Sequence, residues 1–181
     1  MFFLRSRASL LKLLAGVDVK FVFTTDPKGI NVTISGTGLT IANRILATGY
    51  DYHVHVKPVT DGNCTSTGGH LDPANVGVAK PCDPNNLTTC QTGDLAGKHG
   101  NFMGTEDGVV PFTTYIDTQL SFSGDANNTL VGRSVVIHNN GTRIACADII
   151  TADATTTTSG AAKLVGSLAL SGVVAFMMLA F

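Results

Sequence analysis

The chain has 181 residues, enough for one medium-sized domain with a hydrophobic core, and only 14% of them are charged. A formal net charge of −1 and the lack of any basic run exclude the electrostatic pattern of a nucleic-acid-binding protein, so we expect no nucleic-acid partner. Twenty glycines and many short alternating runs favour an all-β domain rich in turns.

The N-terminal stretch has three basic residues, Arg5, Arg7 and Lys12, beside a short run of Leu and Ala. Basic residues followed by an apolar centre are typical of an export signal, although this centre is shorter than usual. We therefore interpret residues 1–14 as a signal or the remnant of one, and we expect the main domain to occupy residues 15–150.

Strand-like runs follow along the chain at 16–24, 30–36, 50–56, 115–122, 133–138 and 142–150. They are short, several of them alternate apolar with polar residues, and none shows the i, i+3, i+4 apolar spacing of a helix. The sequence therefore predicts a Greek-key β-sandwich or flattened barrel of about eight antiparallel strands.

The region 57–112 differs from the rest because it has little strand pattern and holds three of the four cysteines. A loop of this length is uncommon unless it is functional or pinned. Cys82 and Cys90 flank a turn-like segment and can bridge locally, which would leave Cys64 and Cys146 as a long-range pair. Four cysteines allow three connectivities, so this pairing is one of three.

Two features favour an extracellular protein. The cysteine count is even, and five Asn-X-Thr sequons can accept N-linked glycans, at Asn31, Asn63, Asn86, Asn127 and Asn140.

The C-terminal residues suggest attachment to a membrane. Residues 151–163 form a Thr-rich spacer, and residues 164–181 are an uncharged, mostly apolar tail. Small residues, a polar spacer and a terminal apolar tail are the layout of a GPI-anchor signal, and a plain transmembrane tail is the alternative. We expect a glycoprotein at the cell surface or in the cell wall.

Four of the five histidines form a candidate metal site. His53 and His55 lie two apart in a predicted strand, so their side chains point to the same face. Such a pair alone is more often a polar surface feature. His70 after two glycines and His138 at the end of an apolar run strengthen the metal interpretation, because four imidazoles without a free thiolate suit Cu(II) or Zn(II). We interpret His99 as an ordinary loop residue.

Four segments, YHVHV, GNCTSTGGHLDP, TGDLAGKHG and SGDANNTLVGRSVVIHNNGTRIACADI, resemble in order the signature blocks of the copper/zinc superoxide dismutase family. The resemblance covers residues 16–150 and implies a β-sandwich that converts superoxide to oxygen and hydrogen peroxide. It implies copper ligands at His53, His55, His70 and His138. It also implies catalytic roles for Arg143, which guides superoxide, and for His70, which carries a proton, and a disulfide between Cys64 and Cys146.

The zinc site of the two-metal members is incomplete here. Asp94 is retained, but no histidine occurs between residues 71 and 98, and Gln91 stands where a zinc ligand is expected. The seven residues between His138 and Cys146 are too few for the charged loop of the two-metal enzymes. We therefore expect one copper ion and no zinc, as in the extracellular copper-only branch known mainly from fungi.

Gln91 also departs from that branch, where a glutamate usually hydrogen-bonds the histidine equivalent to His70. Glutamine can accept the same hydrogen bond but carries no charge, so we expect Gln91 and Asp94 to act as outer partners of the ligands. The sequence predicts a secreted, surface-anchored copper-only superoxide dismutase with no inferable protein partner. The alternative is a non-enzymatic copper-binding or cell-wall protein on the same fold.

Overall fold

Eight strands and one short α-helix make up the regular structure of the computed structural model, which describes residues 6–12, 16–124 and 126–151. The strands are β1 (Ser6–Lys12), β2 (Asp18–Asp26), β3 (Gly29–Thr37), β4 (Asp51–His55), β5 (Val109–Asp117), β6 (Ser134–Asn139), β7 (Thr142–Asp148) and β8 (Ile150–Thr151). The helix is α1 (Leu95–His99), and two 3₁₀ turns, η1 (Cys64–Thr67) and η2 (Leu87–Thr89), lie in the long loop before it.

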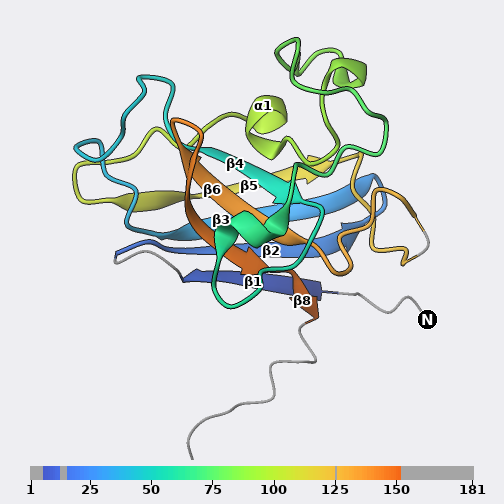
Figure 1. The fold of residues 1–181 in the computed structure, drawn as a ribbon, viewed down its shortest axis with the longest axis horizontal. Coiled ribbons are helices and arrows are strands. Elements are labelled where there is room, and N and C mark those ends of the chain that lie inside the picture. Colours follow the sequence, from blue (N-terminus) through green and yellow to red (C-terminus); the bar gives the residue numbers. More distant parts are fainter. Residues whose placement is uncertain (1–5, 13–15, 125, 152–181) are drawn as a thin grey trace, which may run out of the picture.

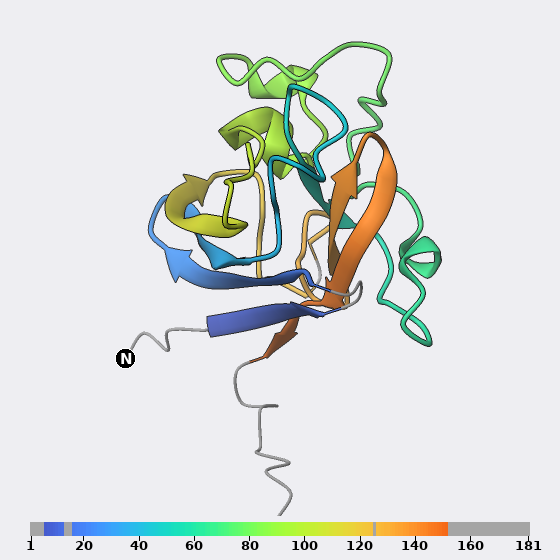
Figure 2. The ribbon, with the colours of Figure 1, turned by 90° about the vertical axis from the view of Figure 1, so that its left-hand side faces the viewer.

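The strands form two open antiparallel sheets, one of five strands in the order β5-β3-β2-β1-β8 and one of three strands in the order β4-β6-β7. The chain crosses between the sheets after β3, β4, β5 and β7, which gives Greek-key connections. Figures 1 and 2 show the three-stranded sheet as a layer beside the blue strands β1–β3. The predicted all-β sandwich is confirmed, and the sheets do not close into a barrel.

The core lies between the sheets because each strand turns alternate side chains inward. In β2, Val19, Phe21 and Phe23 are fully buried, while the residues between them are exposed or half-buried. Tyr52 and Val54 of β4 face this core from the other layer, and the Tyr52 ring stacks on Phe102 with ring centroids 4.3 Å apart. The opposite face of β4 is therefore left for His53 and His55.

Two disulfides hold the long loop between β4 and β5. Cys64 at the start of η1 is bonded to Cys146 of β7, and Cys82 is bonded to Cys90 eight residues later. These are the two pairs that the sequence favours. The first connects the loop to the three-stranded sheet, and the second closes a turn within the loop.

The strand predicted at 115–122 is wrong in its position, because β5 occupies Val109–Asp117. The side chain of Asp117 ends the strand: its Oδ1 accepts hydrogen bonds from the backbone N–H groups of Gln119 and Leu120 and so turns the chain. The described residues also contain the five-residue helix α1, which the sequence pattern did not indicate.

The N-terminal stretch interpreted as a signal contains β1, which pairs with β2 along its whole length, from Ser6 opposite Thr24 to Lys12 opposite Asp18. The five-stranded sheet thus includes residues before position 15. No helix among the described residues is long and apolar enough to cross a membrane. The spacer and tail expected from residue 152 onward lie outside the described residues.

Candidate metal centre

Four histidines from three parts of the chain converge beside the three-stranded sheet. His53 and His55 project from β4, and His138 projects from the neighbouring β6. His70 projects from the long loop, whose backbone forms an isolated antiparallel β-bridge with His55. One potential ligand nitrogen of each ring lies within 4.8 Å of those of the other three. We call these residues, His53, His55, His70 and His138, the histidine cluster. Among the described residues it is the only such group of His, Cys, Asp or Glu.

A tight backbone junction brings these segments together. Leu71 N donates to Val54 O (2.8 Å), Val54 N donates to Gly93 O (2.9 Å), and Gly93 N donates to Leu71 O (2.7 Å). Gly93 is required for this close approach, because a Cβ there would lie 2.3 Å from Val54 O. The junction places Gln91 and Asp94 beside the cluster.

Hydrogen bonds to acceptors define which nitrogen of three rings is free. Nδ1 of His55 lies 2.9 Å from Gly68 O, and Nδ1 of His138 lies 3.2 Å from Gly141 O. Nδ1 of His70 lies 2.6 Å from Oε1 of Gln91. These oxygens only accept, so each Nδ1 carries the proton and each Nε2 keeps a lone pair. The Nε2 atoms of His55 and His138 are 3.3 Å apart, so two lone pairs meet at the same point.

His53 presents its other nitrogen. Its Nε2 lies 3.4 Å from Oδ1 of Asp94, while its Nδ1 is buried and has no hydrogen-bond partner in the described part of the chain. A buried nitrogen without a partner is costly unless something binds it. Its place in the cluster fits a metal ion, for which neutral imidazoles are good ligands.

Burial favours the neutral form of three of the rings, those of His55, His70 and His138. Burial lowers the pKa of His55 to about 3 and the pKa of His138 to about 4, and it also lowers the pKa of His70. Burial alone would raise the pKa of Asp94, but hydrogen bonds from His53 and from Gly97 N outweigh it and lower the pKa. The cluster therefore offers three neutral imidazoles, and an ionised carboxylate lies beside Nε2 of His53.

Arg143 lies directly behind the cluster. Its Nη1 donates to Cys64 O (3.0 Å) and its Nη2 to Gly68 O (2.6 Å), the carbonyl that also accepts from Nδ1 of His55. The Cys64–Cys146 disulfide fixes the first of these carbonyls. The guanidinium of Arg143 and the ring of His55 thus share one hydrogen-bond acceptor, the carbonyl of Gly68.

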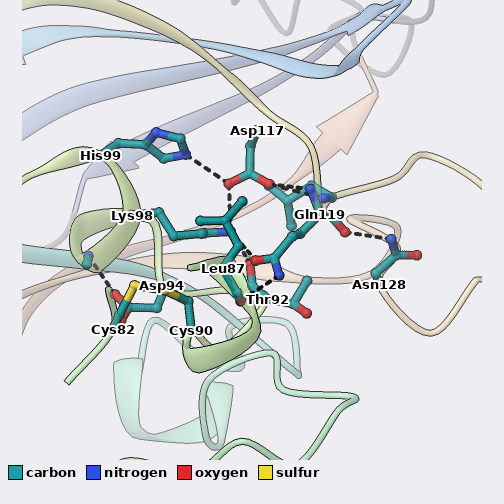
Figure 3. Close-up of polar contacts among 12 residues, drawn as sticks. Cys82, Leu87, Cys90, Thr92, Asp94, Lys98, His99, Asp117, Gln119 and Asn128 are labelled. Atoms are coloured by element: carbon teal, nitrogen blue, oxygen red, sulfur yellow. Dashed lines mark hydrogen bonds and ion pairs between the residues drawn. A yellow bond between two sulfur atoms is a disulfide. The ribbon is translucent and has the colours of Figure 1, made fainter. Parts of the chain in front are cut away.

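Sequence reasoning missed a second buried polar group, shown in Figure 3. Lys98 Nζ lies 2.6 Å from Oδ2 of Asp117, with both side chains 1% exposed, and it donates to Thr92 O (2.7 Å) and to Oε1 of Gln119 (3.2 Å). Nε2 of His99 lies 3.0 Å from the same Asp117 oxygen. We call Lys98, His99, Asp117 and Gln119 the lysine cluster. It fastens α1 and the Thr92 segment to the end of β5.

The groups that would complete a zinc site are engaged elsewhere. Gln91 occupies Nδ1 of His70, and the Asp94 carboxylate caps α1 by accepting from Gly97 N (2.8 Å) as well as contacting His53. A closed zinc site needs four ligands. The two side chains next to His70 and His53 therefore already have hydrogen-bond partners within the protein.

Comparisons with known proteins agree with this geometry. A sequence model of the family described as "Copper/zinc superoxide dismutase (SODC)" matches residues 17–167. The "Cell surface Cu-only superoxide dismutase 5" of Candida albicans is 42% identical over 106 residues, 58% of this chain and 43% of that protein. A "Cell surface Cu-only superoxide dismutase" of Arthroderma benhamiae is 40% identical over 105 residues, 57% of this chain and 28% of that protein. The chain thus spans less than half the length of these two relatives.

A solved structure shares the fold. The structure titled "Candida albicans Superoxide Dismutase 5 (SOD5), Cu(II)" matches with a TM-score of 0.63 and 30% sequence identity, covering 80% of this chain and 90% of that one.

Proposed function

Because this chain belongs to the copper/zinc superoxide dismutase family, we propose that it is a copper-only member, that the histidine cluster holds one copper ion and that the protein converts superoxide to oxygen and hydrogen peroxide. The observation that carries the proposal is the convergence of four free ring nitrogens within 4.8 Å, one of them buried and without another partner. Bound copper would supply one-electron redox chemistry, alternately accepting an electron from superoxide and returning one.

Arg143 attracts the substrate. Residues 15–153 contain 8 basic and 13 acidic side chains, a net charge of −5, so the domain as a whole repels an anion. A cation fixed beside the site produces a local attraction that acts against this repulsion. The two backbone carbonyls that hold the guanidinium keep that charge in place.

His70 handles the proton. Gln91 holds the proton on Nδ1, so Nε2 is the atom that can take up a second proton and pass it to reduced substrate. This ring comes from the loop, whereas the other three come from paired strands, and it is the one best able to move.

The same reasoning supports one copper ion without zinc, because Gln91 and Asp94 are already engaged with His70 and His53.

An extracellular, cell-surface location is supported by the two disulfides and by the names of the relatives. We extend this to a glycosylated protein, with five sequons as acceptors, and to a GPI anchor signalled by residues 164–181.

The decisive experiment measures copper and zinc content together with superoxide consumption by the purified protein. One equivalent of copper with turnover supports the proposal. One equivalent without turnover favours the non-enzymatic copper-binding protein, for which the uncharged Gln91 is the specific argument. A protein that takes up no copper would exclude both functions and leave a structural sandwich.

A further inference from the structure

A continuous chain of hydrogen bonds ends at His70 and begins at a carboxylate. Oδ2 of Asp72 accepts from Nε2 of Gln91 (3.1 Å), and Oε1 of Gln91 lies 2.6 Å from Nδ1 of His70. Asp72 is two residues after His70 in the sequence, and hydrogen bonds through the Gln91 side chain connect the two.

The direction of this chain follows from the chemistry of its members. An ionised carboxylate can only accept, so it must face the NH₂ end of the Gln91 amide. The other end of the amide, an oxygen that only accepts, then faces His70, and Nδ1 of that ring must carry the proton. The lone pair is left on Nε2, which points into the histidine cluster.

Asp72 is held in place by its own turn. Its Oδ1 accepts from Val76 N (3.0 Å) and its Oδ2 from Gly77 N (2.8 Å). Both oxygens of Asp72 thus act as acceptors, and the Gln91 amide is a third donor to this carboxylate.

His70 needs such a device more than its neighbours do. Nδ1 of His55 and Nδ1 of His138 face backbone carbonyls, which accept in any state. His70 faces an amide, which can rotate by 180° and present a donor instead of an acceptor. Reversal would put the lone pair of His70 on Nδ1 and a proton on the nitrogen that the cluster requires.

We propose that Asp72 is a positioning residue, which fixes the orientation of the Gln91 amide and thereby selects the tautomer of His70 that leaves Nε2 free for a metal. The consequence for copper affinity rests on the proposed function, whereas tautomer selection is a property of the metal-free protein. The uncharged Gln91 thus acts in place of a charged hydrogen-bond partner of His70 only because the Asp72 carboxylate fixes the orientation of its amide.

The test is ¹⁵N NMR of the histidine rings in metal-free protein, which distinguishes the two tautomers. We expect His70 to be protonated on Nδ1 in the unmodified chain. In Asp72→Asn the amide at position 72 can present its NH₂ group, so Gln91 can reverse and a substantial Nε2-protonated population of His70 appears. Copper affinity should fall about 10-fold or more, as for other losses of outer-shell partners.

A rescue variant separates this role from a general effect on the loop. In Asp72→Asn/Gln91→Glu the carboxylate at position 91 accepts from both neighbours, so Nδ1 protonation of His70 should return. Asp83→Asn is the matched control, because Asp83 likewise accepts a backbone N–H, that of Asn85, in a turn of the same loop. It should leave the His70 tautomer unchanged.

The inference would be overturned if His70 stayed fully protonated on Nδ1 in Asp72→Asn. It would also be overturned if the folded double variant did not restore Nδ1 protonation of His70. Should Asp72→Asn not fold, Asp72→Ser supplies the same comparison, since a hydroxyl faces either end of the amide and both tautomers should appear. A wild-type chain that binds no copper would refute the proposed function, while the tautomer result would still decide the role of Asp72.

Discussion

The histidine cluster and the lysine cluster both bury polar side chains beside α1, and they differ in how the burial is balanced. In the lysine cluster, Asp117 receives hydrogen bonds from an ammonium, an imidazole and two backbone N–H groups, and Lys98 gives its hydrogens to three oxygens. In the histidine cluster, the outward nitrogens have acceptors as partners, whereas Nδ1 of His53 has no partner among the described residues and the Nε2 atoms of His55 and His138 face each other at 3.3 Å.

This difference indicates what each cluster is for. The lysine cluster contains its own cation and is complete, so it has a structural role, fastening Thr92 and α1 to β5. The histidine cluster gathers lone pairs without a cation, which is the arrangement that a metal ion completes. One short segment of the chain links the two, because Thr92 lies between Gln91 and Asp94, the outer partners of His70 and His53.

Removing a ligand should have the largest effect on the histidine cluster. His138→Ala should weaken Cu(II) binding by more than about 100-fold, since the loss of an outer partner alone costs about 10–100-fold. Chelator competition measures the affinity, and superoxide consumption should fall with copper content. His99→Gln is the control, because it removes a histidine from the lysine cluster and should retain copper. Comparable losses in the two variants would contradict the distinction between the clusters.

Acid should destabilise the two clusters over different pH ranges in the metal-free protein. Unfolded histidines bind protons below about pH 6.5, whereas His55 and His138 stay neutral until their pKa values of about 3 and about 4. The unfolded state therefore binds more protons in this range, and the free energy of unfolding falls as the pH drops from about 6.5 to about 4.

The lysine cluster should respond only at lower pH. Burial alone would raise the pKa of Asp117, but hydrogen bonding from His99 and the charge of Lys98 lower it, so its contribution is lost only as the pH falls below about 4. Urea titrations between pH 3 and 7 test both ranges. Lys98→Met/Asp117→Asn should reduce the change below about pH 4 and keep the change above it. A single acid transition shared by both ranges and unaffected by this double variant would contradict the prediction.

Removing one charge of the lysine cluster should cost stability rather than copper chemistry. Lys98→Met leaves the buried Asp117 carboxylate without its main partner and should lower the free energy of unfolding by about 3–5 kcal/mol. Lys98→Met/Asp117→Asn removes both charges and should regain most of that loss, because an uncompensated charge, not the missing pair, is the main cost. Urea unfolding of metal-free protein measures it, with the exposed Lys20→Met as control. Equal losses in the single and double variants would show that the pair itself stabilises the fold.

Much of the fold could be predicted because alternation is a local signal. The runs 16–24 and 30–36 coincide with β2 and β3, whose buried positions alternate as Val19, Phe21 and Phe23 do. β5 was misplaced because its solvent-facing residues include Phe112, 73% exposed, so the apolar pattern does not mark the buried face. Its end depends on Asp117, whose effect comes from hydrogen bonds rather than from any pattern of apolar residues.

For the site, the sequence predicted residues but not their connections. His53 and His55 could be paired from the strand period alone. The glycines before His70 and the apolar run before His138 added these two as candidate ligands, and the family resemblance implied the same four. The role of Asp72 depends on its contact with Gln91, and the role of Lys98 depends on its contact with Asp117. The members of each pair are 19 residues apart in the sequence, so no local pattern predicts these contacts.

The smallest effect is expected where the two clusters are joined. A carboxylate introduced by Gln91→Glu would still accept from Nδ1 of His70, and its charge would favour copper, but its second oxygen would face Oδ2 of Asp72, now 3.1 Å from Nε2 of the glutamine. Two carboxylates at that distance repel, and one of them is protonated more readily. The single substitution should therefore raise copper affinity less than about tenfold.

Asp72→Asn/Gln91→Glu relieves the repulsion and should bind copper more tightly than Gln91→Glu, as chelator competition at pH 7 would show. A large gain from the single substitution would instead mean that Asp72 turns away from position 91, which would weaken the case for Asp72 as the residue that orients it.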